Sequence, residues 1–214
     1  RDAGAATRLA AAWPQGGAMK RRDVLLNAGA VPLLLAGCAS PQAPTRWYEL
    51  KSEPPEAVPA PRPGDGTVWE LSGRLPLPGT LDRDTLVVSS GAAGVVPLAG
   101  HRWVVPLRDS VPARLAADLA LLRGEGLVWL SPAPAGVVVA RRLRVAIDTL
   151  VADEARQTLS LRARWWFNND PPSTPPTTSL TNIDITLPDR SADALAAAHR
   201  LALWRLAQRI ASAA

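Results

Sequence analysis

The sequence predicts an α+β fold, with a mainly antiparallel or mixed sheet and two helices packed on one face. The clearest strand signal lies in residues 156–167, where apolar and polar side chains alternate. Two stretches with helical spacing of apolar residues, at 109–123 and 191–211, stand far apart along the chain. The order of elements is therefore strands, one helix, strands and one helix.

The first half of the domain contains short strand-like runs separated by proline-rich connections. We expect these strands at residues 46–51, 67–77 and 86–89 and around Val95, with residues 104–107 pairing with the last two. Five prolines between residues 53 and 66 predict an extended surface connection, because proline cannot donate to a sheet ladder.

The first helix is predicted from its apolar spacing. Its apolar positions fall on one helical face: Val111, Leu115, Leu119 and Leu122. Asp109 or Ser110 is a candidate N-cap, and Pro112 is tolerated in a first turn. Gly124 and Gly126 are expected to end the helix.

The second half of the domain is rich in β structure before the final helix. Residues 127–130 predict a short strand, and residues 137–151 and 156–167 predict a long antiparallel pair with its turn at residues 153–154. Four prolines mark residues 168–178 as a loop. A further strand is expected at 180–187, and Ser191 is expected to cap a helix that runs to about Ala211.

The segment around the single methionine resembles an export signal. Lys20, Arg21 and Arg22 follow Met19, and residues 24–35 are uncharged. Twelve residues are too few to span a membrane, so this layout is typical of a signal peptide over residues 19–37. Residues 1–18 are interpreted as an over-extended or non-native leader. The arginine pair also fits a twin-arginine signal, and the sequence does not separate the two export routes.

The single cysteine lies directly after this apolar run. Leu35, Ala36, Gly37 and Cys38 resemble the lipobox of bacterial lipoproteins, in which the cysteine is acylated and becomes the first mature residue. The alternative is a buried, inert cysteine. The lipoprotein resemblance implies three acyl chains on Cys38, and the residues that follow it, Ala39 and Ser40, imply sorting to the outer membrane.

The net charge of +5 is concentrated in the predicted leader and signal peptide. Residues 1–37 hold five basic and two acidic residues, which leaves 19 basic and 17 acidic residues in the 177 that follow. No concentrated basic stripe remains, so a nucleic-acid partner is not expected. We predict a lipidated tether at 38–45 and a single domain at 46–214.

The sequence lacks the common catalytic and phosphate-binding motifs. One cysteine and two histidines make a metal site improbable, and we expect neither a cofactor nor an enzyme. His199 lies in an alanine-rich helix, where a packed histidine is the simpler interpretation. A membrane-anchored hydrolase would need His101 beside a serine or a carboxylate. Trp165 and Trp166 must lie on opposite faces of their strand, which places one of them toward a surface.

Two motifs carry a family resemblance. Residues 78–88 (PGTLDRDTLVV) resemble the P-x-x-L-D-R-x-x-[IL]-V segment of the ABC-type transport auxiliary lipoproteins, the PqiC-like group. Residues 102–107 (RWVVPL) and the helix after them are similar to that family's R-W-x-x-P-L segment. Residues 47–50 (WYEL) fit its Y-x-L start, so the resemblance covers residues 38–211.

The resemblance implies a non-catalytic outer-membrane lipoprotein that faces the periplasm from the inner leaflet. Its implied partners are an MCE-domain protein and an inner-membrane permease, with phospholipid as possible cargo and a homo-oligomeric ring as the assembly. We expect a partner-docking surface made by Leu81, Asp82, Arg83, Arg102, Trp103, Pro106 and Leu107. The alternative for this set is that residues 81–83 form only a turn of the fold and that Trp103 is only a core residue. The alternative is a free-standing periplasmic lipoprotein that binds a lipid or solute, which would need an enclosed apolar pocket.

Overall fold

The computed structural model describes residues 44–60, 66–169 and 175–213. The leader, the signal peptide, Cys38 and the first part of the tether lie outside these residues, and so does part of the loop predicted at 168–178.

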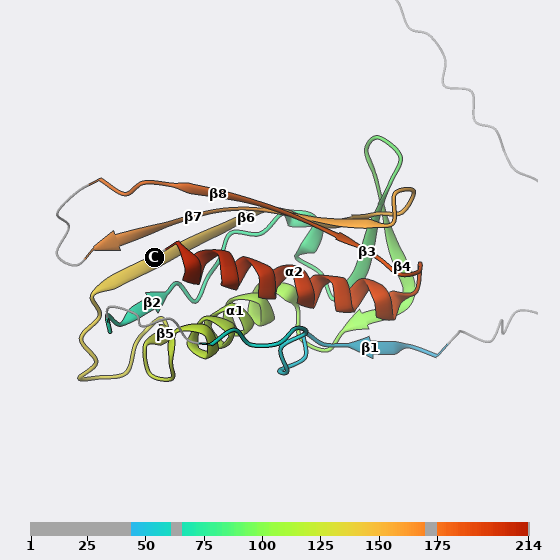
Figure 1. Cartoon of the computed structure of the whole chain (residues 1–214). Helices are drawn as coiled ribbons and strands as arrows, with labels where there is room; N and C mark the ends of the chain where they lie inside the picture. Colours follow the sequence, from blue (N-terminus) through green and yellow to red (C-terminus); the bar gives the residue numbers. More distant parts are fainter. Residues whose placement is uncertain (1–43, 61–65, 170–174, 214) are drawn as a thin grey trace, which may run out of the picture. The chain divides into compact units, whose positions relative to one another are not determined.

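The domain contains an eight-stranded mixed sheet and two α-helices (Figure 1). The strands are β1 Arg46–Tyr48, β2 Trp69–Leu71, β3 Thr85–Ser90, β4 Gly94–Trp103, β5 Val128–Leu130, β6 Arg141–Asp153, β7 Thr158–Asn169 and β8 Ser179–Thr186. The helices are α1 Leu107–Arg123 and α2 Ala192–Ser212, with a short 3₁₀ turn, η1, at Gly79–Leu81. The predicted α+β class is confirmed.

Strand β6 organises the sheet. Its first residues pair in parallel with β2 and its last residues pair in parallel with β3, while β7 pairs antiparallel along the other edge of β6. Beyond β2 the next strand in the sheet is β5. On the other side, β3 pairs with β4 and β4 pairs with β1, while β8 pairs with β7. The backbone N–H of Ile147 donates to Pro76 O (3.0 Å) between the segments that pair with β2 and β3.

The antiparallel pair β6–β7 confirms the strongest local prediction. On β7, Leu159, Leu161, Ala163 and Trp165 are buried, whereas Arg162 and Arg164 are exposed. Trp166, the neighbour of Trp165, is only partly buried, as expected for side chains on opposite faces. β6 begins at Arg141 rather than at residue 137. Residues 137–140 come after a turn at Gly136, where φ is positive, and are not part of the strand.

Several predicted boundaries in the first half of the domain are wrong. The strand expected at 67–77 contains only Trp69–Leu71, after which the chain passes close to Ser131: a Cβ on Gly73 would lie 2.9 Å from Ser131 O. The run around Val95 extends through Trp103 as one strand, β4. Residues 104–107 therefore form no separate strand but lead into α1.

The start of α1 also differs from the prediction. The helix begins at Leu107, and the carbonyl of Pro106 accepts the backbone N–H groups of Asp109 and Ser110 (both 3.0 Å). Neither Asp109 nor Ser110 is the N-cap, because both lie inside a helix that begins at Leu107 and whose N-cap is Pro106. Ser191 does cap α2, since its Oγ accepts the N–H of Ala194 (3.1 Å).

The core lies between the sheet and the helix layer. Val111, Leu115 and Leu119 of α1 are fully buried, which confirms the predicted apolar face of this helix. α2 packs against α1, β7 and β8. The guanidinium of Arg123, in the last turn of α1, lies 3.4 Å from the ring centroid of buried Trp69 on β2. This cation–π contact joins the end of α1 to the sheet.

Candidate docking site

The predicted docking residues are brought together where η1, the end of β4 and the start of α1 meet. Leu81 ends η1, Arg102 and Trp103 end β4, and Leu107 begins α1. The backbone N–H of Trp103 donates to Asp84 O (2.6 Å), which fixes the end of β4 against the segment after η1. The two motifs that carry the family resemblance are therefore neighbours in space.

Three of the predicted docking residues are core residues. Leu81, Trp103 and Leu107 are almost completely buried and belong to the hydrophobic core. The prediction that they form part of a contact surface needs correction, because their side chains are not available to a partner in this fold. Their apolar character anchors the exposed charged residues beside them. Pro106 is partly exposed between the two groups.

The exposed members of the set form two ion pairs. Arg102 Nη1 lies 2.5 Å from Asp84 Oδ2, and Arg108 Nη1 lies 2.6 Å from Asp82 Oδ1. The hydrogen bond from Arg102 holds the pKa of Asp84 below its usual value, and the bond to Asp82 raises the pKa of Arg108. Each pair links the segment after η1 to β4 or to α1.

Arg83 lies between the two paired aspartates. It is exposed and forms no hydrogen bond or ion pair within the described part of the chain. The Arg83 guanidinium is therefore unpaired among these residues, although the local charges balance, because Asp109 Oδ2 also lies 3.5 Å from Arg108 Nε.

Exposed apolar side chains border these ion pairs. Trp47 is 58% exposed, Val104 is 55% exposed and Val105 is 45% exposed. Trp47 on β1 is in register with Arg102 on β4, and the N–H of Val104 donates to Tyr48 O (2.8 Å). We call the charged residues Asp82, Arg83, Asp84, Arg102 and Arg108, together with Trp47, Val104 and Val105, the docking surface. Exposed apolar groups rimmed by charges are typical of interaction sites.

Sequence reasoning missed five of the eight residues of this surface. Asp84 and Arg108 complete the two ion pairs, and Trp47, Val104 and Val105 supply the apolar part. Trp47 carries no signal of exposure, because a tryptophan in a strand is more often buried. Arg108 could have been found from its place in the first turn of a helix that follows Pro106.

Within the described part of the chain, neither histidine is hydrogen-bonded to a serine, a cysteine or a carboxylate. The His101 Nδ1 is 2.9 Å from the phenolic oxygen of Tyr48, and this phenol takes the place that a hydrolase would give to a serine or a carboxylate. His199 is buried and packs edge-on against Trp103, with 5.3 Å between the two ring centroids. Its Nδ1 lies 2.8 Å from Leu195 O. Burial lowers the pKa of His199 to about 4, so the ring is neutral at pH 7.

The described residues hold no group of three histidine, cysteine or acidic side chains that could bind a metal ion. Among the helices in this part of the chain, none is long and apolar enough to cross a membrane.

A family model for the ABC-type transport auxiliary lipoprotein component matches residues 48–211, which include both motifs and the whole docking surface except Trp47. The chain belongs to this family. The resemblance seen in residues 78–88 and 102–107 is thereby confirmed. No curated protein matches the chain.

Two solved structures share the fold of this auxiliary lipoprotein. One, a crystal structure of an uncharacterized protein, is 13% identical with a TM-score of 0.61 and aligns over 79% of this chain and 98% of that chain. The other, a Xanthomonas campestris protein of the DUF330 family, is 13% identical with a TM-score of 0.59 and aligns over 77% of this chain and 92% of that chain. At this identity the likeness shows the fold alone.

Proposed function

We propose that this auxiliary lipoprotein is a non-catalytic subunit of an MCE/ABC-type intermembrane lipid transport system and docks the periplasmic MCE component at the outer membrane. Membership of the ABC-type transport auxiliary lipoprotein family supports the link to a transporter. The observation that carries the docking role is the apolar and charged docking surface, to which the family motifs contribute Asp82, Arg83 and Arg102.

The predicted lipid on Cys38 supports the outer-membrane location. Ala39 and Ser40 follow it, and three acyl chains hold a protein on a membrane stably where one chain does not. The domain then begins only a few residues beyond the lipid, so it stands close to the inner leaflet and faces the periplasm. An inner-membrane permease, phospholipid cargo and a ring of copies belong to the same proposal.

The docking surface suits a protein partner. Its ion pairs are exposed and therefore contribute little to the stability of the isolated domain. Arg83 adds a guanidinium with no partner among the described residues, and Trp47 supplies a large apolar contact of the kind enriched in interfaces. A partner with an apolar patch bordered by an acidic group complements this arrangement.

The second candidate function is a free-standing lipoprotein that binds a lipid or solute. It is favoured only by a hollow of about 620 Å³ beside the C-terminal half of α2. That hollow is an open groove with Arg205, Gln208 and Arg209 on its floor, whereas a lipid site is expected to be enclosed and largely apolar. The docking role is therefore the better supported of the two.

Co-purification tests the proposed function. The full-length lipoprotein, tagged at its C-terminus, is isolated from crosslinked envelopes of the native host, and its partners are identified by mass spectrometry. We expect an MCE-domain protein among the enriched partners, and we expect less of it with the double variant Trp47→Ala, Arg83→Ala. Recovery of the lipoprotein without any MCE-domain protein would overturn the proposal.

A further inference from the structure

Strand β8 leaves one edge of the sheet open. Among the described strands it pairs only with β7, in a continuous register from Ser179 to Thr186. Just beyond this register, the N–H of Leu187 donates to Gln157 O (2.8 Å). The backbone groups of Leu187 therefore face β7. Because backbone groups alternate in direction along a strand, those of Ile183, four residues earlier, also face β7, whereas the N–H and C=O groups of Asn182 and Asp184 point away from the sheet.

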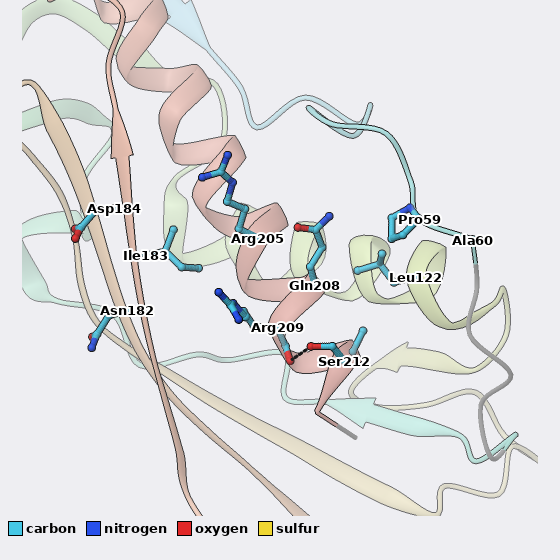
Figure 2. Close-up of a pocket in the computed structure, with 11 residues that line it drawn as sticks. Pro59, Ala60, Leu122, Asn182, Ile183, Asp184, Arg205, Gln208, Arg209 and Ser212 are labelled. Atoms are coloured by element: carbon cyan, nitrogen blue, oxygen red, sulfur yellow. Dashed lines mark hydrogen bonds between the residues drawn. The ribbon is translucent and has the colours of Figure 1, made fainter.

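A groove of about 620 Å³ runs beside this open edge (Figure 2). Residues 182–184 of β8 form one wall, and Leu122 of α1 and Pro59 line the opposite side. The floor is α2, which contributes its polar residues at helical spacing: Arg205, Gln208, Arg209 and Ser212. These residues share one face of the helix, so the groove has outward-facing backbone groups on its wall and a polar floor.

The charges on the floor are not equally available. Arg205 is engaged, since its Nη2 donates to Glu56 Oε1 (2.9 Å). Arg209 is exposed, and its guanidinium forms no hydrogen bond or ion pair to any residue that the structure describes. On the wall, the carboxylate of Asp184 accepts the hydroxyl of Ser160 on β7 (2.6 Å). Among the described residues, the groove therefore offers the unpaired guanidinium of Arg209 on its floor, with outward-facing backbone donors and acceptors and the hydrogen-bonded carboxylate of Asp184 on its wall.

We propose that this groove binds an extended acidic segment of a partner protein. The segment adds to β8 as a further strand, with its backbone bonded to Asn182 and Asp184. A carboxylate of the segment then pairs with Arg209 across the groove, which gives the site its preference for acidic sequences. Alternate side chains of the added strand point toward α2 or toward solvent, as in other complexes formed by strand addition.

A protein segment fits this groove better than a lipid does. Only Ile183, Leu122, Pro59 and two alanines give it apolar surface, and acyl chains need an enclosed apolar cavity. The open edge of β8 has no use in lipid binding but is a ready template for strand addition. This site is separate from the docking surface and does not depend on the lipid transport role.

Peptide binding to the full-length protein tests the proposal. The probe is a fluorescein-labelled ten-residue peptide in which valine alternates with glutamate, and its fluorescence polarisation is followed as the protein is added. We expect the matched peptide with lysine in place of glutamate to bind about tenfold more weakly, because it brings like charge to Arg209.

Two pairs of variants locate the site. Asn182→Pro removes an outward N–H while leaving the ladder to β7 intact, and Asn182→Ala keeps that N–H. Arg209→Gln removes the free charge, and Arg156→Gln removes an exposed charge in the β6–β7 turn. We expect Asn182→Pro and Arg209→Gln each to weaken peptide binding about fivefold, and we expect the controls to leave it unchanged.

Two results would overturn the proposal. One is equal binding of the acidic peptide by the wild type and by Arg209→Gln, which is a surface variant that does not disturb folding. The other is displacement of the bound peptide by the short-chain anionic lipid dihexanoylphosphatidylglycerol but not by excess unlabelled peptide, which would assign the groove to lipid headgroups instead.

Discussion

Asp118 of α1 and Arg200 of α2 form a bidentate ion pair in the interior of the domain. Arg200 Nη1 lies 2.7 Å from Asp118 Oδ2, and Arg200 Nη2 lies 2.7 Å from Asp118 Oδ1. Arg200 Nε also donates to the carbonyl of Lys51 (2.8 Å). One buried guanidinium thus joins both helices to the segment that follows β1.

This pair predicts a pronounced asymmetry between single and double variants. Burial raises the pKa of the Asp118 carboxyl, and the bonds from Arg200 oppose that rise. Removing Arg200 as Arg200→Met leaves the carboxylate without its partner and should lower the free energy of unfolding by about 3–5 kcal/mol. The double variant Asp118→Leu, Arg200→Met should be less destabilised than this single variant, as measured by urea unfolding.

The exposed pair Asp148–Arg164 is the matched control for this prediction. It is also bidentate, with Arg164 Nε 2.8 Å and Nη2 2.7 Å from the Asp148 carboxylate oxygens, but it lies at the surface of β6 and β7. Arg164→Met should change the free energy of unfolding by no more than about 1 kcal/mol. Equal effects of Arg164→Met and Arg200→Met would show that burial does not determine the contribution of the interior pair.

His199 predicts a loss of stability as the pH falls. Its pKa is lowered to about 4 in the fold, against 6.5 for an unperturbed histidine. Between these values the unfolded chain takes up a proton that the folded chain does not, so stability is fully present above pH 6.5 and is lost progressively toward pH 4. The total contribution is about 3 kcal/mol by linkage.

The variant His199→Gln isolates this effect. Unfolding free energies of wild type and variant, measured in urea at pH 7 and pH 5, should differ in their pH dependence, with a shallower decline for the variant. His101→Gln, which removes a histidine that is only partly buried, should retain the wild-type decline. A decline that is unchanged in His199→Gln would refute the assignment to this residue.

The predicted lipid on Cys38 gives a direct prediction about location. Cys38→Ser removes the predicted acylation site, and three acyl chains are the expected attachment to the membrane. We expect the wild type to sediment with the outer-membrane fraction and to release only in detergent, and we expect the variant to remain in the soluble fraction. Mass spectrometry of the wild type should find a mature chain that begins at an acylated Cys38, whereas an unmodified cysteine would contradict the lipobox interpretation.

Local periodicity predicted the elements whose pattern is complete within one segment. The alternation of Leu159, Leu161 and Ala163 on β7 and the helical spacing of Val111 and Leu115 on α1 were sufficient, because each reports burial on one face of a single element. The cap at Ser191 was equally local.

Long-range contacts determined what the sequence did not predict. β2 ends at Leu71, and two residues later a distant part of the chain, at Ser131, passes so close to Gly73 that a Cβ would not fit there. Trp103 and Leu107 carry the family motif, yet their burial depends on how β4 meets α1 and α2, which no local pattern encodes. Trp47 is exposed because β1 is a short strand at the edge of the sheet.

Site-specific photo-crosslinking in native envelopes tests the docking proposal most directly. A photoreactive amino acid replaces Val105 on the docking surface or, as the control, Val138, which is 84% exposed outside that surface. We predict an adduct between position 105 and an MCE-domain protein, and no such adduct from position 138. Adducts of equal yield from both positions, or none from position 105 in an envelope that contains the MCE-domain protein, would contradict the account.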